Sequence, residues 1–242
     1  MRIPRIYTPA PLASGSIIEL DDNAFNHAVR VLRLKAGAPL TLFNGQGGEY
    51  PAELVEVQKK RATAQVGTFV DRDCESPLPI VLGQCISRGE KMDYTIQKAV
   101  ELGVTEIVPL FSERCGVKLS PERQEKRLRH WQSVIISACE QCGRNRLPAL
   151  QDAMDLDAWL AKLDSSLKLV LDPTAQDSFE TLSRPTPDVA LLIGPEGGLS
   201  ETEIERARAS GFRGVQLGPR ILRTETAGLT ALSLIQGRWG DL

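Results

Sequence analysis

The apolar and polar positions along the chain follow two different patterns, and the change falls near residue 75. Before it, short runs of alternating apolar and polar residues are separated by turns that contain glycine, such as NGQGG at 44–48. Alternation with a period of two is typical of strands with one buried face, so we expect a small antiparallel barrel or sheet. The runs predict strands at 16–20, 38–45, 49–57 and 61–70.

One helix and one linker complete this first region. The stretch DDNAFNHAVRVLRL predicts a helix with Asp21 or Asp22 as its N-cap. The segment DCESPLP, at 73–79, is typical of a linker. We therefore expect one domain at 1–73 and a second at 74–242.

After the linker, apolar runs alternate with helical segments. Apolar strands that alternate with helices predict an α/β fold, with a largely parallel sheet covered on both faces. The expected strands are 80–86, 106–111, 167–172, 189–193 and 214–217. The expected helices are near 91–102, 121–142, 155–164, 200–210 and 224–238.

The composition limits the class of protein. The chain has 242 residues, of which 42% are hydrophobic, enough for one large core or two modest ones. No run of 18 apolar residues occurs, and MRIPRIYTPA lacks the apolar core of a signal peptide. Five scattered cysteines favour a reduced, cytoplasmic protein. Cys139 and Cys142 form a single CxxC, which is more typical of two residues that pack in a helix than of a metal site.

The charge is unevenly distributed. The net charge of −2 argues against a protein that binds nucleic acid over its whole surface. Residues 114–146, however, hold eight basic and three acidic side chains. A second basic group comprises Arg2, Arg5, Arg30, Arg33 and Lys35. The two groups together favour an anionic partner, whereas either alone is equally typical of a solvated surface.

The most informative stretch is DVALLIGPEGGLSETEIERARASG, at 188–211. A strand ends at Gly-Pro-Glu-Gly-Gly, and a helix starts with Ser200 as N-cap and Glu203 three residues on, a capping box. Leu199 and Ile204 fall at the positions of a hydrophobic staple. This pattern predicts a strand, a glycine loop and a helix in succession.

Ligands of open α/β sheets bind beyond the carboxyl ends of the strands, where this loop lies. The loop is neither GxxxxGK[ST] nor GxGxxG, and Glu196 places a negative charge where a phosphate would lie. An adenosine with hydroxyls and a cationic tail fits better. The segments GVQLGPRILRTETAG (214–228) and LVLDPT (169–174) have the same layout, so we expect the three loops to form one pocket.

These residues resemble a known family. IGPEGGLSETE followed by LGPRILRTETA is similar to the SPOUT methyltransferases, and most of all to the ribosomal RNA small subunit methyltransferase E family. MRIPRIY, HAVRVLRLKAG, KMDYTIQKAVELGV and ACEQCGR resemble that family too, so the likeness covers nearly the whole chain.

The resemblance implies a fold and an activity. The domain at 74–242 would be a SPOUT domain with a C-terminal trefoil knot, and 1–73 a PUA-like barrel that binds RNA. A homodimer would use S-adenosylmethionine to methylate N3 of a uridine in the decoding region of 16S ribosomal RNA, free or in the small subunit. The resemblance implies no metal and no membrane.

The resemblance also implies site residues. Arg223 would stabilise a uracil oxygen and Glu225 would act as the base; the alternative is that the two pair with each other or cap the last helix. Glu196 would bind a ribose hydroxyl or offset the sulfonium charge. The residues expected at the donor are Leu171, Asp172, Pro173, Ile193, Gly194, Pro195, Glu196, Gly197, Gly198, Leu217, Gly218, Ile221, Leu222, Arg223 and Thr226.

The expected RNA contacts are mostly basic. Arg30 and Arg33 would share one helix face, whereas His27 is equally typical of a packing or capping residue. Glu140 and Arg144 are four apart on a predicted helix, so an ion pair is the simpler interpretation of Arg144. The full set is Arg2, Arg5, His27, Arg30, Arg33, Arg88 and Arg144.

Three alternatives remain open from the sequence. Ribose 2′-O-methylation by another SPOUT enzyme would need a different activating group, because a ribose hydroxyl is far less acidic than N3. A non-catalytic RNA-binding module would bind RNA without the methyl donor. A Rossmann-type enzyme is disfavoured because IVLGQCISRGEK lacks the glycine pattern of that fold.

Overall fold

The computed structural model describes residues 3–116, 120–185 and 187–242. The chain divides into two compact units, of which the first comprises 1–75 and 136–147 and the second comprises 76–135 and 148–242. The sequence predicted a boundary at 73/74, and it did not predict that residues 136–147 belong to the first unit. The two domains expected at 1–73 and 74–242 stay a prediction.

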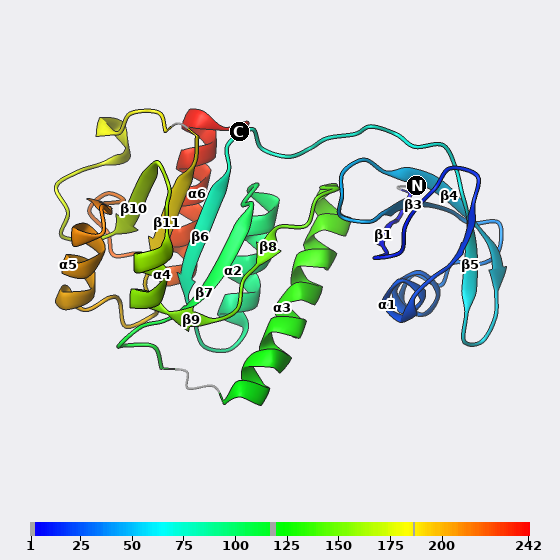
Figure 1. The fold of residues 1–242 in the computed structure, drawn as a ribbon, viewed down its shortest axis with the longest axis horizontal. Helices are drawn as coiled ribbons and strands as arrows, with labels where there is room; N and C mark the ends of the chain where they lie inside the picture. The colour runs from blue at the N-terminus through cyan, green and yellow to red at the C-terminus, as the bar shows by residue number, and fades with distance from the viewer. Residues whose placement is uncertain (1–2, 117–119, 186) are drawn as a thin grey trace. The chain divides into compact units, whose positions relative to one another are not determined.

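The first unit contains a five-stranded sheet in the order β1-β3-β4-β5-β2 (Figure 1). Neighbouring strands are antiparallel except β1 and β3, which are parallel. All four expected strands are present, and β1 was missed because three residues are too few to show an alternating pattern. The strands are β1 (Arg5–Tyr7), β2 (Ile17–Glu19), β3 (Pro39–Phe43), β4 (Tyr50–Val57) and β5 (Ala62–Val66).

The expected helix of this unit is present in a modified form. Helix α1 (Asp22–Phe25) has Asp21 as its N-cap and continues directly as a π-helix (Asn26–Val31). The helix ends there, and Arg33 follows with φ of 55°. The expectation that Arg30 and Arg33 share one helix face is therefore wrong, because Arg33 lies past the end of the helix in a left-handed conformation.

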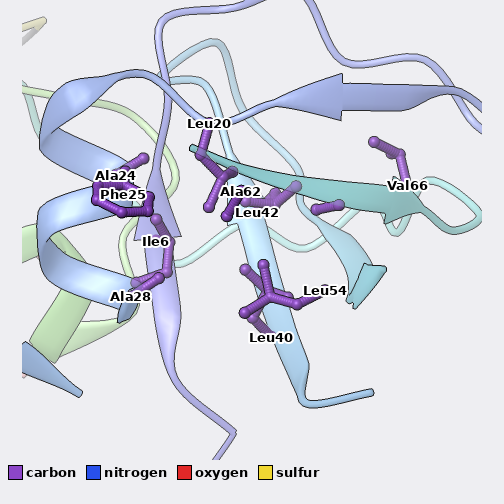
Figure 2. Packing of buried hydrophobic residues seen from close by; sticks show 11 residues of the cluster. Ile6, Leu20, Ala24, Phe25, Ala28, Leu40, Leu42, Leu54, Ala62 and Val66 are labelled. Atoms are coloured by element: carbon purple, nitrogen blue, oxygen red, sulfur yellow. The ribbon is translucent and has the colours of Figure 1, made fainter. Parts of the chain in front are cut away.

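The core of the first unit fills the space between this helix and the sheet (Figure 2). Ala24, Phe25 and Ala28 contribute the helical side of the cluster, and alternate strand residues such as Leu40 and Leu42 contribute the other side. Burial of these apolar side chains, at about 25 cal/mol per Å², stabilises the unit.

The second unit contains a seven-stranded sheet in the order β12-β10-β11-β6-β7-β8, with β9 also paired to β7. All of its strand pairs are parallel, so the expected α/β class is confirmed. The two-residue strands were not expected. The strands are β6 (Ile80–Cys85), β7 (Glu106–Phe111), β8 (Ala149–Leu150), β9 (Met154–Asp155), β10 (Leu167–Leu171), β11 (Val189–Ile193) and β12 (Arg213–Val215).

Five helices follow these strands, close to the expected positions, together with an unexpected 3₁₀ helix (Phe179–Thr181). The second of these helices crosses the division between the units, because its residues from 136 onward belong to the first unit. They are α2 (Glu90–Glu101), α3 (Pro121–Cys142), α4 (Leu156–Lys162), α5 (Glu201–Ala209) and α6 (Thr224–Trp239).

Alternating residues of the central strands face different helices. Leu192 belongs to the core cluster that contains residues of α4 and α5, and Gly83 lies directly against the ring of Trp159 on α4. Ile193 instead faces Gly228 of α6. Helices therefore cover both faces of the sheet, as the apolar strands predicted.

Within the part of the chain that the structure describes, no helix combines the length and the apolar composition that a bilayer crossing requires.

Candidate functional site

Three loops meet at the carboxyl ends of β10, β11 and β12, which are neighbours in the sheet. They enclose a pocket of about 860 Å³. The loops following β10 and β11 and the segment from β12 to α6 contribute most of its lining, as the convergence of strand ends in a parallel sheet requires.

Most of the residues expected at the donor line this pocket. Thr226 does not; it lies exposed on α6. The expected residues that line it are Leu171, Asp172, Pro173, Ile193, Gly194, Pro195, Glu196, Gly197, Gly198, Leu217, Gly218, Ile221, Leu222 and Arg223.

Charged side chains that sequence reasoning missed also reach the pocket. Lys91 belongs to α2, after β6, and Arg114 follows β7, so their approach depends on the strand order rather than on any local motif. Helix α5 adds Glu201, Glu205 and Arg208, and the last loop adds Arg220. Helical spacing after Ser200 could have indicated the α5 residues, because Glu201, Glu205 and Arg208 lie three and four apart.

The glycines of the β11–α5 loop have different roles. A Cβ on Gly194 would lie 3.0 Å from the backbone nitrogen of Leu199, and one on Gly197 would lie 3.2 Å from Cβ of Arg114. Gly198 has φ of 69° and open space around it. The first two permit close packing of the loop, whereas the third permits its backbone turn.

The capping box expected at the start of α5 is present. Ser200 Oγ accepts from the N–H of Glu203 at 3.1 Å, and Glu203 Oε2 accepts from the N–H of Ser200 at 2.8 Å. The other carboxylate oxygen of the buried Glu203 accepts from the N–H of Glu113, also at 2.8 Å. One carboxylate thus joins the loop after β7 to the loop after β11.

Asp172 is buried and fixes the loop after β10. Its Oδ1 accepts from the N–H of Thr174 at 2.8 Å and from the hydroxyl of Thr174 at 2.7 Å. Its Oδ2 accepts from the guanidinium of Arg208 at 2.8 Å. Because both oxygens accept hydrogen bonds from protein groups, the carboxylate fixes the position of this loop at the pocket.

The loop after β12 is anchored at its far end. Thr224 Oγ1 donates to the carbonyl of Gly194 at 2.6 Å and accepts from Nε2 of the buried Gln84 at 3.2 Å. Gly218 has φ of 73°, and Ile221 is 86% exposed although it lines the pocket. The anchor joins the start of α6 to the end of β11.

A cluster of charges lies at the start of α2. Lys91 Nζ is 3.7 Å from Glu196 Oε1 and 4.0 Å from Glu225 Oε2. The N–H of Arg88 donates to Glu196 Oε1 at 2.9 Å. Burial raises the pKa of Glu196, but the backbone N–H groups of Arg88 and of Glu196 itself, with the Lys91 and Arg88 charges, outweigh burial and hold the pKa below its usual value.

Within the described residues, Arg223 and Glu225 do not form an ion pair with each other, and the Arg223 side chain does not cap α6. Arg223 is the N-cap residue of α6, but its side chain makes no capping hydrogen bond. Among the described residues, the ion pair of Glu225 is with Lys91. Oε2 of Glu225 is buried and has no hydrogen-bond partner within the described part of the chain.

Two of the expected RNA contacts are buried in the first unit. The guanidinium of Arg5 is bound by Glu49 and Asn145, and that of Arg144 lies 2.6 Å from Glu75; each side chain is 6% exposed. We correct both assignments, because a guanidinium enclosed by its own carboxylate partner is not presented to a phosphate. The sequence gives the charge of an arginine but not its burial.

The ion pair expected between Glu140 and Arg144 is also wrong, since α3 ends at Cys142. Glu140 Oε2 instead lies 2.9 Å from His27 Nδ1, and its Oε1 accepts from the N–H of Tyr7 at 3.0 Å. The hydrogen bond that His27 donates to Glu140 raises the pKa of His27, and the negative charge of Glu140 acts in the same direction, against the effect of burial. His27 therefore has the packing role that was the alternative to RNA contact.

The remaining expected RNA contacts are accessible or not described. Arg30, Arg33 and Arg88 are exposed. Arg30 also stacks on Phe25, with its guanidinium carbon 5.5 Å from the ring centroid. Arg2 lies outside the described residues. Contact of the exposed arginines with RNA stays a prediction. Across the described ranges, no group of three or more His, Cys, Asp or Glu is arranged to hold a metal ion.

Comparison with known proteins places the chain in a family. A family model described as RNA methyltransferase domain matches residues 74–236, and one described as RNA methyltransferase PUA domain matches residues 20–67. Ribosomal RNA small subunit methyltransferase E of Buchnera aphidicola (subsp. Schizaphis graminum) is 39% identical over 242 residues, which cover 100% of this chain and 98% of the relative. The chain belongs to the ribosomal RNA small subunit methyltransferase E family.

Solved structures agree with this assignment. The protein is similar to a methyltransferase of Legionella pneumophila in complex with S-adenosylmethionine, with a TM-score of 0.98 and 44% identity over the whole of both chains. It is also similar to ribosomal RNA small subunit methyltransferase E of Neisseria gonorrhoeae bound to S-adenosylmethionine, with a TM-score of 0.93 and 42% identity, again over both whole chains. The family member is therefore an RNA methyltransferase, and the alternative of a non-catalytic binding module is set aside.

Proposed function

We propose that this protein transfers a methyl group from S-adenosylmethionine to N3 of a uridine in the decoding region of 16S ribosomal RNA. The single observation that carries the proposal is the pocket formed by the three loops at adjacent strand ends. Two similar proteins, solved with S-adenosylmethionine, support the donor. The choice of N3 rests on the family resemblance.

The residues of the pocket fit the donor. A volume of about 860 Å³ suits a nucleoside with an amino-acid tail, since ligand pockets range over roughly 300–1,000 Å³. At Gly198 and Gly218 the space that a Cβ would occupy is open. The Glu196 carboxylate, held ionised, offsets the positive charge of a sulfonium. When bound, the donor supplies an electrophilic methyl group.

Glu225 and Arg223 would act on the uridine. N3 carries a proton at neutral pH and must lose it before it can attack, so a base is needed. Oε2 of Glu225 is buried and free of hydrogen-bond donors among the described residues, and it takes this proton. N3 then bonds to the methyl carbon as the carbon–sulfur bond breaks, while Arg223, which lines the pocket, stabilises the negative charge on a uracil oxygen.

Product analysis tests the reaction. Unmodified 16S RNA and small subunits assembled from it are each incubated with the enzyme and labelled S-adenosylmethionine, and the RNA is digested to nucleosides. We expect 3-methyluridine. Label in a 2′-O-methylated nucleoside, or in none with either substrate, would overturn the proposal.

The base is tested by Glu225→Gln, which keeps the shape of the side chain and removes its proton affinity. We expect kcat to fall about 100-fold or more, the usual loss for a general base, while the Kd for S-adenosylmethionine changes less than about threefold. Glu101→Gln, an equivalent change at a carboxylate outside the pocket lining, is the control. Full turnover by Glu225→Gln would exclude the base role.

We also propose the finer features that the resemblance implies: a trefoil knot in the C-terminal region, a homodimer, a PUA-like RNA-binding unit and a cytoplasmic location. The hydrogen bond from Thr224 to the carbonyl of Gly194 supports the knot, because it joins the start of α6 to the loop after β11. Sedimentation equilibrium of the purified protein tests the dimer, and a single species of about one chain mass would contradict it.

A further inference from the structure

Lys91 is the side chain that connects two carboxylates from separate segments at the pocket. Its Nζ lies 3.7 Å from Oε1 of Glu196, in the β11–α5 loop, and 4.0 Å from Oε2 of Glu225, in α6. Lys91 also lines the pocket, so its ammonium is within reach of a bound substrate. No role was expected for it from the sequence.

The backbone before Lys91 has an unusual conformation. Gly89, the N-cap residue of α2, has φ of 59° and ψ of −139°, and a side chain there would be strained although no atom lies within 4 Å. This turn places the N–H of Arg88 on Glu196 and Lys91 one residue inside the helix. Residues held in rare conformations often cluster at functional sites.

The two carboxylates depend on Lys91 to different degrees. Glu196 accepts the N–H of Arg88, so it has a stabilising donor apart from Lys91. Oε2 of Glu225 is buried and has no hydrogen-bond partner among the described residues, and at 4.0 Å the ammonium is too far for a hydrogen bond. Lys91 is thus the cation that faces Glu225 without occupying the oxygen that must accept a proton.

We propose that Lys91 is a positioning residue for methyl transfer, a counter-ion shared by Glu225 and Glu196. This inference rests on the proposed function. Before the reaction, the ammonium attracts the Glu225 carboxylate and orients it. When the N3 proton moves to Glu225, that carboxyl becomes neutral, and the ammonium keeps Glu196 as its counter-charge. The three side chains therefore sum to a charge of −1 before the proton moves and to zero after it, and the ammonium faces a carboxylate in both states.

The test compares Lys91→Met, which removes the charge and keeps the length, with Lys91→Arg, which restores the charge. Lys98→Met is the matched control, because Lys98 lies on the same helix and pairs with Glu101 at 2.7 Å, outside the pocket lining. For each variant, 3-methyluridine formation gives kcat, calorimetric titration gives the Kd for S-adenosylmethionine, and thermal unfolding checks the fold.

We expect Lys91→Met to lower kcat about 10- to 100-fold with a Kd within about threefold of the wild type, as loss of an interaction made in the reaction requires. Lys91→Arg should recover most of the rate, and Lys98→Met should match the wild type. In the Glu225→Gln background, Lys91→Met should lower the residual rate less than about threefold, because residues that act through one another are not additive.

Three results would overturn the inference while leaving the proposed function intact. They are an unchanged kcat in Lys91→Met, a Kd that weakens as much as kcat falls, and a full additional loss in the Glu225→Gln background. The second would make Lys91 a residue that binds the donor. If Lys91→Met unfolds, Lys91→Gln replaces it. A wild type that binds the donor but forms no 3-methyluridine would instead overturn the proposed function.

Discussion

Gly218 lies in the loop after β12 with φ of 73°, and no atom lies within 4 Å of the position of a Cβ. A side chain there would therefore meet no protein atom but would strain the backbone. At Gly194, in the loop after β11, a Cβ would instead meet the protein, because it would lie 3.0 Å from the backbone nitrogen of Leu199. A substitution at Gly218 is thus the cleaner probe of the pocket.

We expect Gly218→Ala to weaken S-adenosylmethionine binding about tenfold, because roughly 1–2 kcal/mol of left-handed strain displaces the loop. Calorimetric titration measures the affinity. Gly211→Ala is the matched control, since Gly211 has φ of 88°, open space and no part in the pocket lining. Both variants should lose similar stability, and equal binding by both would contradict a donor site at Gly218.

At the residue scale, the sequence predicted the pocket residues that belong to the glycine loops, and it missed the charged residues that reach the pocket from other segments. Leu217 is the last residue of one apolar run and Gly194 directly follows another, and Gly-Pro comes after each run. Both were therefore expected at the same edge of the sheet. Lys91 and Arg114 follow β6 and β7, and no local pattern indicates that β6 neighbours β11 and that β7 comes next in the sheet. Arg5 was assigned to RNA because charge is visible in a sequence and burial is not.

Among the elements, helix α5 shows how a local signal becomes a tertiary contact. The Ser200–Glu203 capping box was predicted from spacing alone. The second hydrogen bond of Glu203, to the N–H of Glu113, was not, since it joins residues 90 apart. The cap therefore stabilises the start of the helix and its contact with the loop after β7 together.

We expect Ser200→Ala to lower the free energy of unfolding of the second unit by about 1 kcal/mol, and Ser200→Gly by only a few tenths. Alanine removes the oxygen that accepts from Glu203, whereas glycine leaves the N-cap backbone accessible to water. Urea unfolding followed by tryptophan fluorescence measures this, because Trp131, Trp159 and Trp239 all belong to the second unit. Equal losses in the two variants would show that the side chain does not act as a cap.

Element boundaries were predicted well where burial sets them and poorly where hydrogen bonding does. Strands β7 and β11 have the bounds that their apolar runs predicted. Strand β12 ends at Val215, before the expected Leu217, because the N–H of Gln216 turns to the carbonyl of Asp177. The π-helix of the first unit is invisible to a pattern with a period of 3.6 residues.

On the scale of the whole molecule, the chain leaves the first unit near residue 75 and returns to it at 136–147. A buried ion pair and several hydrogen bonds tie the returning segment to residues far away in the sequence. Arg144 pairs with Glu75, and Asn145 accepts from Arg5 and donates to the carbonyl of Arg72 at 3.0 Å. No motif in the sequence indicates such a return, because the helix that enters it, α3, is continuous from Pro121 to Cys142.

The pair of His27 and Glu140 makes this return sensitive to pH. The pKa of His27 is raised in the folded protein, chiefly by its hydrogen bond to Glu140, so the protonated form stabilises the first unit. That contribution is fully present below the unfolded pKa of about 6.5 and is lost as the pH rises through the folded pKa.

We therefore expect the free energy of unfolding of the first unit to fall as the pH rises above about 6.5 in the wild type relative to Glu140→Gln, by about 1 kcal/mol or less for a partly exposed pair. The glutamine keeps an oxygen to accept from the N–H of Tyr7, so the change removes the charge alone. Urea titrations at several pH values, followed by the NMR signals of β3 and β4, measure the unit itself. Parallel pH profiles for the two proteins would mean that His27 is neutral in the folded state and that Glu140 holds it without its charge.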